Sequence, residues 1–280
     1  MRNLKNMTGH SSEVAAGSRF EFGKNWASFL ATLDDARIKN AEQSLIQMLE
    51  MPDLKGKTFV DVGCGSGLFS LAARRLGASV HSFDYDPASV GCTAELRRRY
   101  FPNDASWHVE EGSALDPAYL KSLGRFDIVY SWGVLHHTGN MWSALDNVNA
   151  LVQPGGRLFI ALYNDQGKIS VRWTKVKRLY NQLPRSLHFL VVGPVLVQQS
   201  WRRVVKGTLR GRPFQWLRDY HTQRGMSYWH DIIDWVGGYP FEVARADEVF
   251  EFYKARNYTL TRLITDCGLG CNQFVFVKTT

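Results

Sequence analysis

Three closely spaced glycines and a later carboxylate form the first candidate site of this chain. Gly63, Gly65 and Gly67 follow the apolar run 58–62, so we expect them in the turn between a buried strand and a helix. Such a turn lets a ligand lie against bare backbone and face the free N–H groups of the helix. Asp84 follows about twenty residues later, where a carboxylate can accept hydrogen bonds from a ribose diol. The pattern predicts a nucleoside site.

Two residues argue that this nucleoside is not part of a dinucleotide. Leu68 stands where the fingerprint G-x-G-x-x-G, counted from Gly63, requires its third glycine. Asp61 precedes the loop, where a carboxylate would repel a pyrophosphate but would suit an ammonium group or another positive centre. The chain also lacks the G-x-x-x-x-G-K-[ST] loop of nucleoside triphosphate sites.

The elements that must position these residues alternate between strands and helices. Repeated βα units predict an α/β fold with a mostly parallel sheet and helices on both faces. The last two strands have no helix between them, so they should pair antiparallel. The predicted strands are 57–62, 78–83, 106–110, 126–131, 156–162, 260–265 and 273–278, and the predicted helices are 18–51, 66–76, 87–100, 141–152 and 246–256.

Five segments resemble the motifs of one family in that family's order. The segment 60–67 resembles motif I of class I S-adenosylmethionine-dependent methyltransferases. In turn, 83–86 resembles the acidic strand end that holds the ribose, and 111–115 the loop beside the adenine; 126–137 resembles motif IV, and 151–158 the turn before strand five. The resemblance is nearest to the sugar- and quinone-type O-methyltransferases. It implies a Rossmann-like seven-stranded sheet and S-adenosyl-L-methionine as the cofactor.

The cofactor-binding residues are predicted from the resemblance together with the local patterns. Asp86 precedes Pro87 and should cap the following helix, which leaves Asp84 free for the ribose. Ser113 stands where the family often has an acidic residue. The resemblance implies that Arg37 faces the methionine carboxylate, although a solvated helix residue explains it equally well. The full prediction is Arg37, Asp61, Gly63, Cys64, Gly65, Gly67, Asp84, Tyr85, Ser113, Ala114, Ser131 and Trp132.

Two adjacent histidines are the first catalytic candidates. Methylation of an oxygen needs a base to take its proton, and histidine is the usual base near neutral pH. His136 and His137 follow strand four, where this topology places the acceptor. Adjacent side chains point in different directions, so we expect one of them to face the pocket, and the resemblance favours His137. The alternative is that both rings make structural hydrogen bonds.

The segment 164–240 interrupts the alternation and is predicted to be a helical, basic and aromatic insert that caps the substrate. Tyr228, His230 and Asp231 lie in its most aromatic and polar stretch and are further catalytic candidates. The alternative is an aromatic helix docked on the core. No metal is predicted, because the spacing of the acidic residues and histidines in this stretch matches no metal motif. Residues 19–163 and 241–280 form the predicted core, and 1–18 a flexible tail.

Charge is concentrated in the insert. The chain has a net charge of +8, yet the segment 165–225 alone holds thirteen lysines and arginines and two acidic residues. Three interpretations remain open for 168–212: a solvated lid face, peripheral contact with an anionic membrane through the apolar run 187–197, and a nucleic-acid groove. The groove ranks last, because no RNA- or DNA-binding module is recognisable.

These observations predict a cytoplasmic methyltransferase, with peripheral membrane contact left open. No apolar run is long enough to span a bilayer, no secretory signal precedes the core, and the four cysteines fit free thiols. The expected reaction is O-methylation of a small-molecule acceptor at a sugar or phenol-like hydroxyl. Whether a lipid carries this acceptor is left open. The alternatives are an RNA methyltransferase and a cofactor-binding module without catalysis. The sequence does not predict an oligomeric state.

Overall fold

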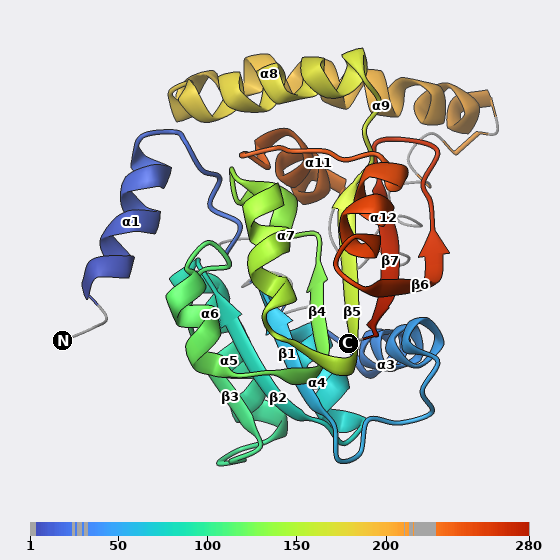
Figure 1. Ribbon diagram of the computed structural model, residues 1–280. Coiled ribbons are helices and arrows are strands. Elements are labelled where there is room, and N and C mark those ends of the chain that lie inside the picture. The colour runs from blue at the N-terminus through green and yellow to red at the C-terminus, as the bar shows by residue number, and fades with distance from the viewer. Residues whose placement is uncertain are drawn as a thin grey trace.

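The computed structural model confirms the predicted α/β fold. Seven strands form one sheet in the order β3-β2-β1-β4-β5-β7-β6 (Figure 1). The strands β1 to β5 pair parallel, whereas β7 runs antiparallel to both of its neighbours, as expected. The bounds are β1 Thr58–Val62, β2 Ser79–Asp84, β3 Trp107–Glu111, β4 Phe126–Trp132, β5 Val152–Tyr163, β6 Tyr258–Ile264 and β7 Cys271–Lys278.

The structure describes most of the chain. The described residues are 4–23, 26, 30, 33–209, 211–212, 215 and 228–279, and for 4–8, 202 and 228–231 the description is of the backbone alone. The helices are α1 Leu4–Ala15, α3 Asp35–Leu49, α4 Leu68–Arg75, α5 Pro87–Tyr100, α6 Pro117–Leu123, α7 Met141–Asn149, α8 Lys168–Gln182, α9 Phe189–Leu209, α11 Tyr228–Gly237 and α12 Ala246–Lys254, with short 3-10 turns η1 Leu135–His137 and η2 Arg185–Leu187.

Two apolar layers cover the two faces of the sheet. On one face α3, α4 and α5 pack through residues such as Ile38, Leu71 and Leu96. On the other face α7 and α12 pack through residues such as Leu145 and Tyr253. Because both faces are covered, most side chains of β1 and β4 are buried, and polar groups that can meet a ligand lie at the carboxyl ends of the strands.

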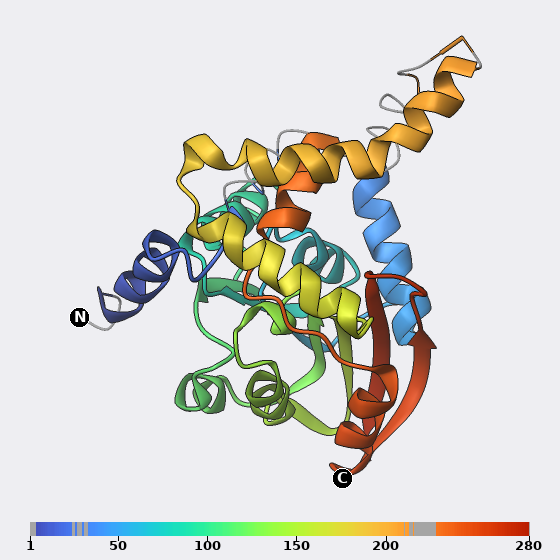
Figure 2. The ribbon, with the colours of Figure 1, turned by 90° about the horizontal axis from the view of Figure 1, so that it is seen from above.

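The insert lies over the carboxyl ends of the parallel strands. In Figure 1, α8, α9 and α11 lie above the ends of β4 and β5. These helices share a small core of their own, in which Tyr180, Val192 and Val236 are buried. Figure 2 shows α8 and α9 diverging from the turn that joins them, with the last turns of α9 projecting away from the rest of the protein. Within the described ranges, no helix combines the length and the apolar character that crossing a bilayer requires.

The N-terminal region differs from the prediction. The expected flexible tail 1–18 contains the helix α1, and the predicted helix 18–51 contains α3, which begins only at Asp35. The start of α3 is fixed by Asp34, whose carboxylate accepts a hydrogen bond from the Arg37 N–H. The sequence analysis also missed α6, although Asp116 before Pro117 is a cap signal of the same kind as the correctly predicted Asp86.

Candidate active site

A cavity of about 1180 Å³ opens where the parallel strands end. The ends of β1, β2, β4 and β5 supply one wall, the helices α9 and α11 of the insert supply another, and the chain around α1 supplies a third. We refer to the insert helices α8, α9 and α11 as the cap. Its lining includes Asp61, Gly63, Cys64, Gly65, Asp84, Tyr85, Ser113, Ala114, Trp132, His137, Tyr163, Arg203, Asp234 and Trp235, together with His10, Glu13 and Arg19.

The glycine loop is shaped by its neighbours as much as by its own backbone. Gly63 has a φ of 79°, and a Cβ there would lie 2.3 Å from a methyl of Val134, so the loop can pack against η1 only without a side chain. Gly67 also has a positive φ, but a Cβ there would meet Thr93 of α5. Gly67 is absent from the cavity lining, and its role is structural, because it is the N-cap residue that precedes α4.

Asp84 holds the loop and also faces the cavity. Its carboxylate accepts hydrogen bonds of 2.9 Å from the N–H groups of Gly65 and Asp86. Burial raises the pKa of Asp84 to about 6, and the hydrogen bonds only partly offset this rise. Asp86 accepts from Ala88 and Gly23, so it is a structural cap, as predicted. Asp84 therefore keeps acceptor capacity for hydroxyl donors in the cavity.

Asp61 is a second buried carboxylate in the same wall. It is 2% exposed, and its only hydrogen-bond partner among the described side chains is the Ser70 hydroxyl, at 2.5 Å. Ser70 in turn shares a hydrogen bond with Ser82, which accepts from the Trp107 indole. Burial, with a smaller contribution from the charge of Asp84, raises the pKa of Asp61 to about 7. Two carboxylates with raised pKa values make this wall suited to a positively charged ligand.

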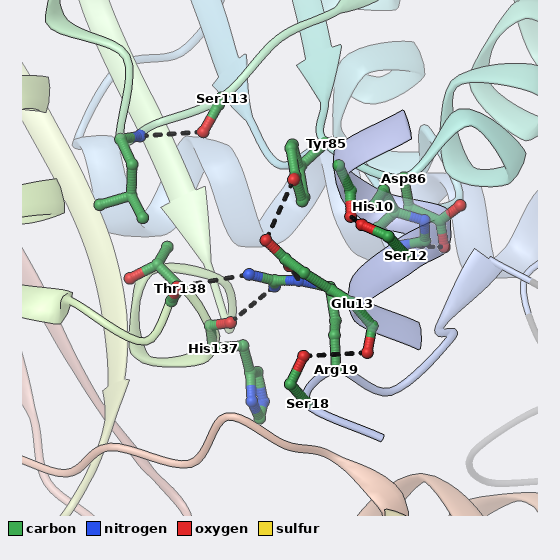
Figure 3. Close-up of polar contacts among 12 residues, drawn as sticks. His10, Ser12, Glu13, Ser18, Arg19, Tyr85, Asp86, Ser113, His137 and Thr138 are labelled. Carbon is green, nitrogen blue, oxygen red and sulfur yellow. Dashed lines mark hydrogen bonds and ion pairs between the residues drawn. The ribbon is translucent and has the colours of Figure 1, made fainter. Parts of the chain in front are cut away.

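The chain around α1 supplies a part of the site that the sequence analysis missed. Arg19 donates to the carbonyl oxygens of His137 and Thr138, at 2.9 and 3.3 Å, and its Nε donates to Glu13 (Figure 3). The Arg19 guanidinium also lies 5.0 Å from the ring centre of Tyr85, whose hydroxyl donates to Glu13. The segment thus joins the end of β2 to η1. The only sequence feature that could have indicated this contact is the pair of charged residues Glu13 and Arg19. A polar terminal segment has no hydrophobic periodicity from which such a role could be predicted.

This set of groups fits the predicted cofactor. A glycine loop that lines the cavity, a candidate ribose acceptor and buried carboxylates agree with a nucleoside that carries a sulfonium and an ammonium group. Residues 35–229 match the family model described as a methyltransferase domain, which is well over half of the chain. The chain belongs to this methyltransferase family.

Relatives and solved structures agree with that assignment. The methyltransferase is similar to the ubiquinone biosynthesis O-methyltransferase of Coxiella burnetii, with 29% identity over 161 residues that cover 57% of this chain and 63% of that protein. It is also similar to the tRNA U34 carboxymethyltransferase of Klebsiella pneumoniae, with 31% identity over 138 residues that cover 46% of this chain and 40% of that protein. The chain thus spans less than two thirds of the length of these relatives.

The fold comparison agrees with the sequence comparison. The magnesium protoporphyrin IX methyltransferase of Synechocystis, solved with bound SAH, has a TM-score of 0.52 and 12% identity to the chain, and the match covers 86% of this chain and 83% of that one. The Rossmann-like sheet and the methyltransferase family are therefore confirmed.

The two candidate histidines of the methyltransferase are in different environments. The His137 Nδ1 lies 2.5 Å from the Pro240 carbonyl, which can only accept, so Nδ1 carries the proton and Nε2 keeps its lone pair. His137 lines the cavity, and burial lowers its pKa to about 3. His136 is fully buried outside the lining, and its Nδ1 accepts from the Tyr163 N–H. His137 is therefore the histidine that a ligand can meet.

Three predicted cofactor contacts lie elsewhere. Arg37 is not among the lining residues, and its guanidinium is 3.8 Å from Asp34 of its own helix cap. Ser131 is fully buried and donates to the Val62 carbonyl, so it braces β1 against β4. Gly67 is the N-cap residue of α4, as described above. Local packing engages the Ser131 hydroxyl and the Gly67 backbone, whereas the Arg37 Nη1 is buried without a hydrogen-bond partner among the described residues.

The cap side of the cavity is aromatic. Tyr163 and Trp235 line it, with their ring centres 5.8 Å apart, and Trp132 lies at the rim and donates to Gln273. The candidate side chains Tyr228, His230 and Asp231 lie outside the described residues, although their backbone forms the start of α11. Their roles stay predictions.

A buried lysine anchors the cap. Lys177 of α8 is fully buried and donates from Nζ to the Trp235 carbonyl. Its ammonium also lies 4.1 Å from the Trp235 ring and 4.7 Å from the Phe241 ring. Burial lowers the pKa of Lys177 to about 7. Lys177 is one of the thirteen basic residues counted in 165–225, but it is not part of a solvated or lipid-facing surface, because it is buried and joins α8 to α11.

Proposed function

We propose that the chain transfers a methyl group from S-adenosylmethionine to a phenol-like hydroxyl of a small, flat acceptor. The observation that carries the proposal is the state of His137, whose Nδ1 is committed to Pro240 and whose Nε2 is left as an acceptor at the cavity wall. The turn that carries His137 packs against Gly63 through Val134, so base and cofactor loop are adjacent.

The low pKa of His137 favours one class of acceptor. A neutral imidazole accepts a hydrogen bond at any physiological pH, but a pKa of about 3 makes it a weak proton acceptor. A phenol ionises near pH 10, as tyrosine does, and so gives up its proton far more readily than an aliphatic sugar hydroxyl. Between the two hydroxyls that the sequence leaves open, the phenol suits this base better.

The proposed reaction follows from the places of these residues around the cavity. S-adenosylmethionine, when bound, would supply a sulfonium-bound methyl group, so the new C–O bond to the acceptor would form as the S–CH3 bond breaks, and the sulfur would leave as the neutral thioether. The hydroxyl proton passes toward the His137 Nε2. The carboxylates of Asp61 and Asp84 would hold the cofactor, and the walls from α9, α11 and the α1 region would exclude water. Aromatic lining from Tyr163 and Trp235 would align a flat ring.

The surface of the cap favours an acceptor that arrives from a membrane. Large apolar side chains on α8 and α9 are exposed rather than buried; they are Ile169, Val171, Leu179, Phe189, Leu190, Val197, Trp201, Val205 and Leu209. Exposed basic residues lie among them, including Lys168, Arg172, Lys175, Arg178 and Lys206. Apolar and basic groups together suit the headgroup boundary of an anionic bilayer. The proposal therefore includes a lipid-linked phenol and peripheral binding.

The central test separates cofactor binding from catalysis. Asp84→Ala should weaken SAH binding in calorimetry by at least tenfold, because it removes both the ribose acceptor and a brace on Gly65. His137→Ala should leave SAH binding within about threefold but lower turnover of a catechol or hydroquinone about 100-fold. His136→Asn is the matched control: its amide can still accept from Tyr163, so turnover should persist.

Two results would reject the proposal. Full turnover in His137→Ala would show that His137 is not the base. SAH binding without turnover of any phenol would favour a non-catalytic module. Vesicles test the membrane part separately. Co-sedimentation with phosphatidylglycerol vesicles should exceed that with phosphatidylcholine and fall in Lys175→Glu/Arg178→Glu. Equal sedimentation with both lipids would refute peripheral binding through this face.

A further inference from the structure

Two histidines and a glutamate meet on the sheet edge, away from the cavity. His81 of β2 and His108 of β3 are register partners in a parallel pair, and their ring centres lie 4.9 Å apart. Glu110 follows two residues after His108, so it projects from the same face of β3. One ligand atom from each of the three side chains lies within 4.8 Å of the others. None of the three lines the cavity.

The donor atoms already point to one place. The His81 Nε2 lies 3.1 Å from the Glu110 Oε1, and the His108 Nε2 lies 3.3 Å from the Glu110 Oε2. Each ring thus meets a different oxygen of the same carboxylate. A neutral imidazole nitrogen and a carboxylate oxygen are both ligands for a divalent transition metal, and the ion would replace the protons that now join them.

The surroundings support the three side chains without closing the site. The Tyr119 hydroxyl donates to the Glu110 Oε1 at 2.8 Å, which orients the carboxylate as the outer shell of a metal site does. The Phe126 ring packs beside His81, with the ring centres 6.1 Å apart. The exposed fraction of the side chain rises from 18% at His81 to 60% at His108, so an ion could enter from solvent and keep bound water.

We propose that His81, His108 and Glu110 bind one divalent transition-metal ion of the zinc class at the β2–β3 edge. Two imidazoles and one carboxylate favour zinc, nickel or copper over magnesium and calcium, which prefer oxygen ligands alone. Three protein ligands leave a position for water, as in other three-ligand zinc sites. The site is separate from the methyl-transfer site and does not depend on the proposed function.

The test is zinc binding to the full chain after dialysis against a chelator. Calorimetry with Zn2+ should find one equivalent bound with micromolar or tighter affinity, and Mg2+ should give no heat. His108→Ala should weaken zinc binding at least tenfold, and because His108 is largely exposed, this variant should fold. Glu110→Gln keeps the shape of the side chain and should show the same loss. Cys267→Ser is the control for zinc held by the exposed thiol, and it should bind as the wild type does.

A second measurement is the melting temperature. Zinc at about 100 times its dissociation constant should raise the wild-type melting temperature by about 4 °C and leave that of His108→Ala unchanged. The proposal fails if the wild type binds no zinc. It also fails if His108→Ala and Glu110→Gln bind zinc with wild-type affinity, or if Cys267→Ser abolishes binding.

Discussion

Replacing Asp61 with asparagine should stabilise the cofactor-free protein while weakening cofactor binding. Asp61 is 2% exposed, and burial raises its pKa from 3.8 to about 7. Between these values the native state holds more protons than the unfolded state, so stability falls as pH rises. A difference of about three pKa units corresponds to about 4 kcal/mol above pH 7. The asparagine amide is neutral, and its oxygen can still accept from Ser70.

The assay is urea unfolding of the cofactor-free protein at several pH values. The gain in unfolding free energy of Asp61→Asn over the wild type should be small at pH 4 and approach about 4 kcal/mol at pH 8. SAH affinity should fall in the same variant, because it removes the carboxylate that we propose lies near the ammonium group of the ligand. A gain that stays constant from pH 4 to pH 8 would refute the reasoning.

Asp127→Asn is the matched control for this experiment. Burial opposes ionisation of Asp127, but hydrogen bonds from the N–H and hydroxyl of Thr58 and the nearby Lys57 ammonium hold its pKa below the usual value. A carboxylate with a lowered pKa stabilises the native state at neutral pH and loses that effect in acid. Asparagine should therefore destabilise at this position, the opposite sign to Asp61→Asn.

Three further predictions follow from other contacts. Arg19→Ala removes the donor to the His137 and Thr138 carbonyls, so it should raise the KM for S-adenosylmethionine about tenfold and increase proteolysis near α1. Unchanged kinetics would contradict the role of that segment in the site. Lys177→Met should abolish a rise in stability between pH 7 and pH 10, since a depressed lysine pKa leaves the native state with fewer protons in that range; urea unfolding measures it. Gly112→Ala would place a Cβ 2.3 Å from the Tyr119 ring, and SAH affinity in calorimetry should fall about tenfold, whereas wild-type affinity would mean that the loop is not in contact with the cofactor.

The core could be predicted from the sequence because its signals are local. The strand 58–62 ends in a glycine turn, and Asp86 before Pro87 caps a helix; each of these follows from a few neighbouring residues. Repetition of such units then determines a parallel sheet, and the absence of a helix between the last two strands determines the antiparallel end.

The site could be predicted only in part, because its remaining contacts join distant segments. Arg19 donates to the carbonyl of His137, which lies more than a hundred residues away in sequence, and no periodicity in 1–19 predicts this contact. In the sequence, Lys177 cannot be distinguished from the other basic residues of its helix. Only the structure shows that the Trp235 carbonyl and two aromatic rings surround its ammonium group. The prediction of Ser131 fails for the opposite reason: its type and position suit a ligand, but its hydroxyl already donates to the Val62 carbonyl, while Arg37 does not line the cavity.

The burial of Lys177 makes it a natural reporter of cap opening. With a pKa of about 7, a substantial part of this amine is unprotonated at neutral pH, yet its fully buried Nζ is sealed between α8 and α11. An acylating reagent in solution can modify it only during openings that separate the two helices. The labelling rate of this one amine, followed by peptide mass spectrometry, therefore measures how often the cap opens. A ligand that closes the cap should slow that rate, even if it leaves the melting temperature unchanged.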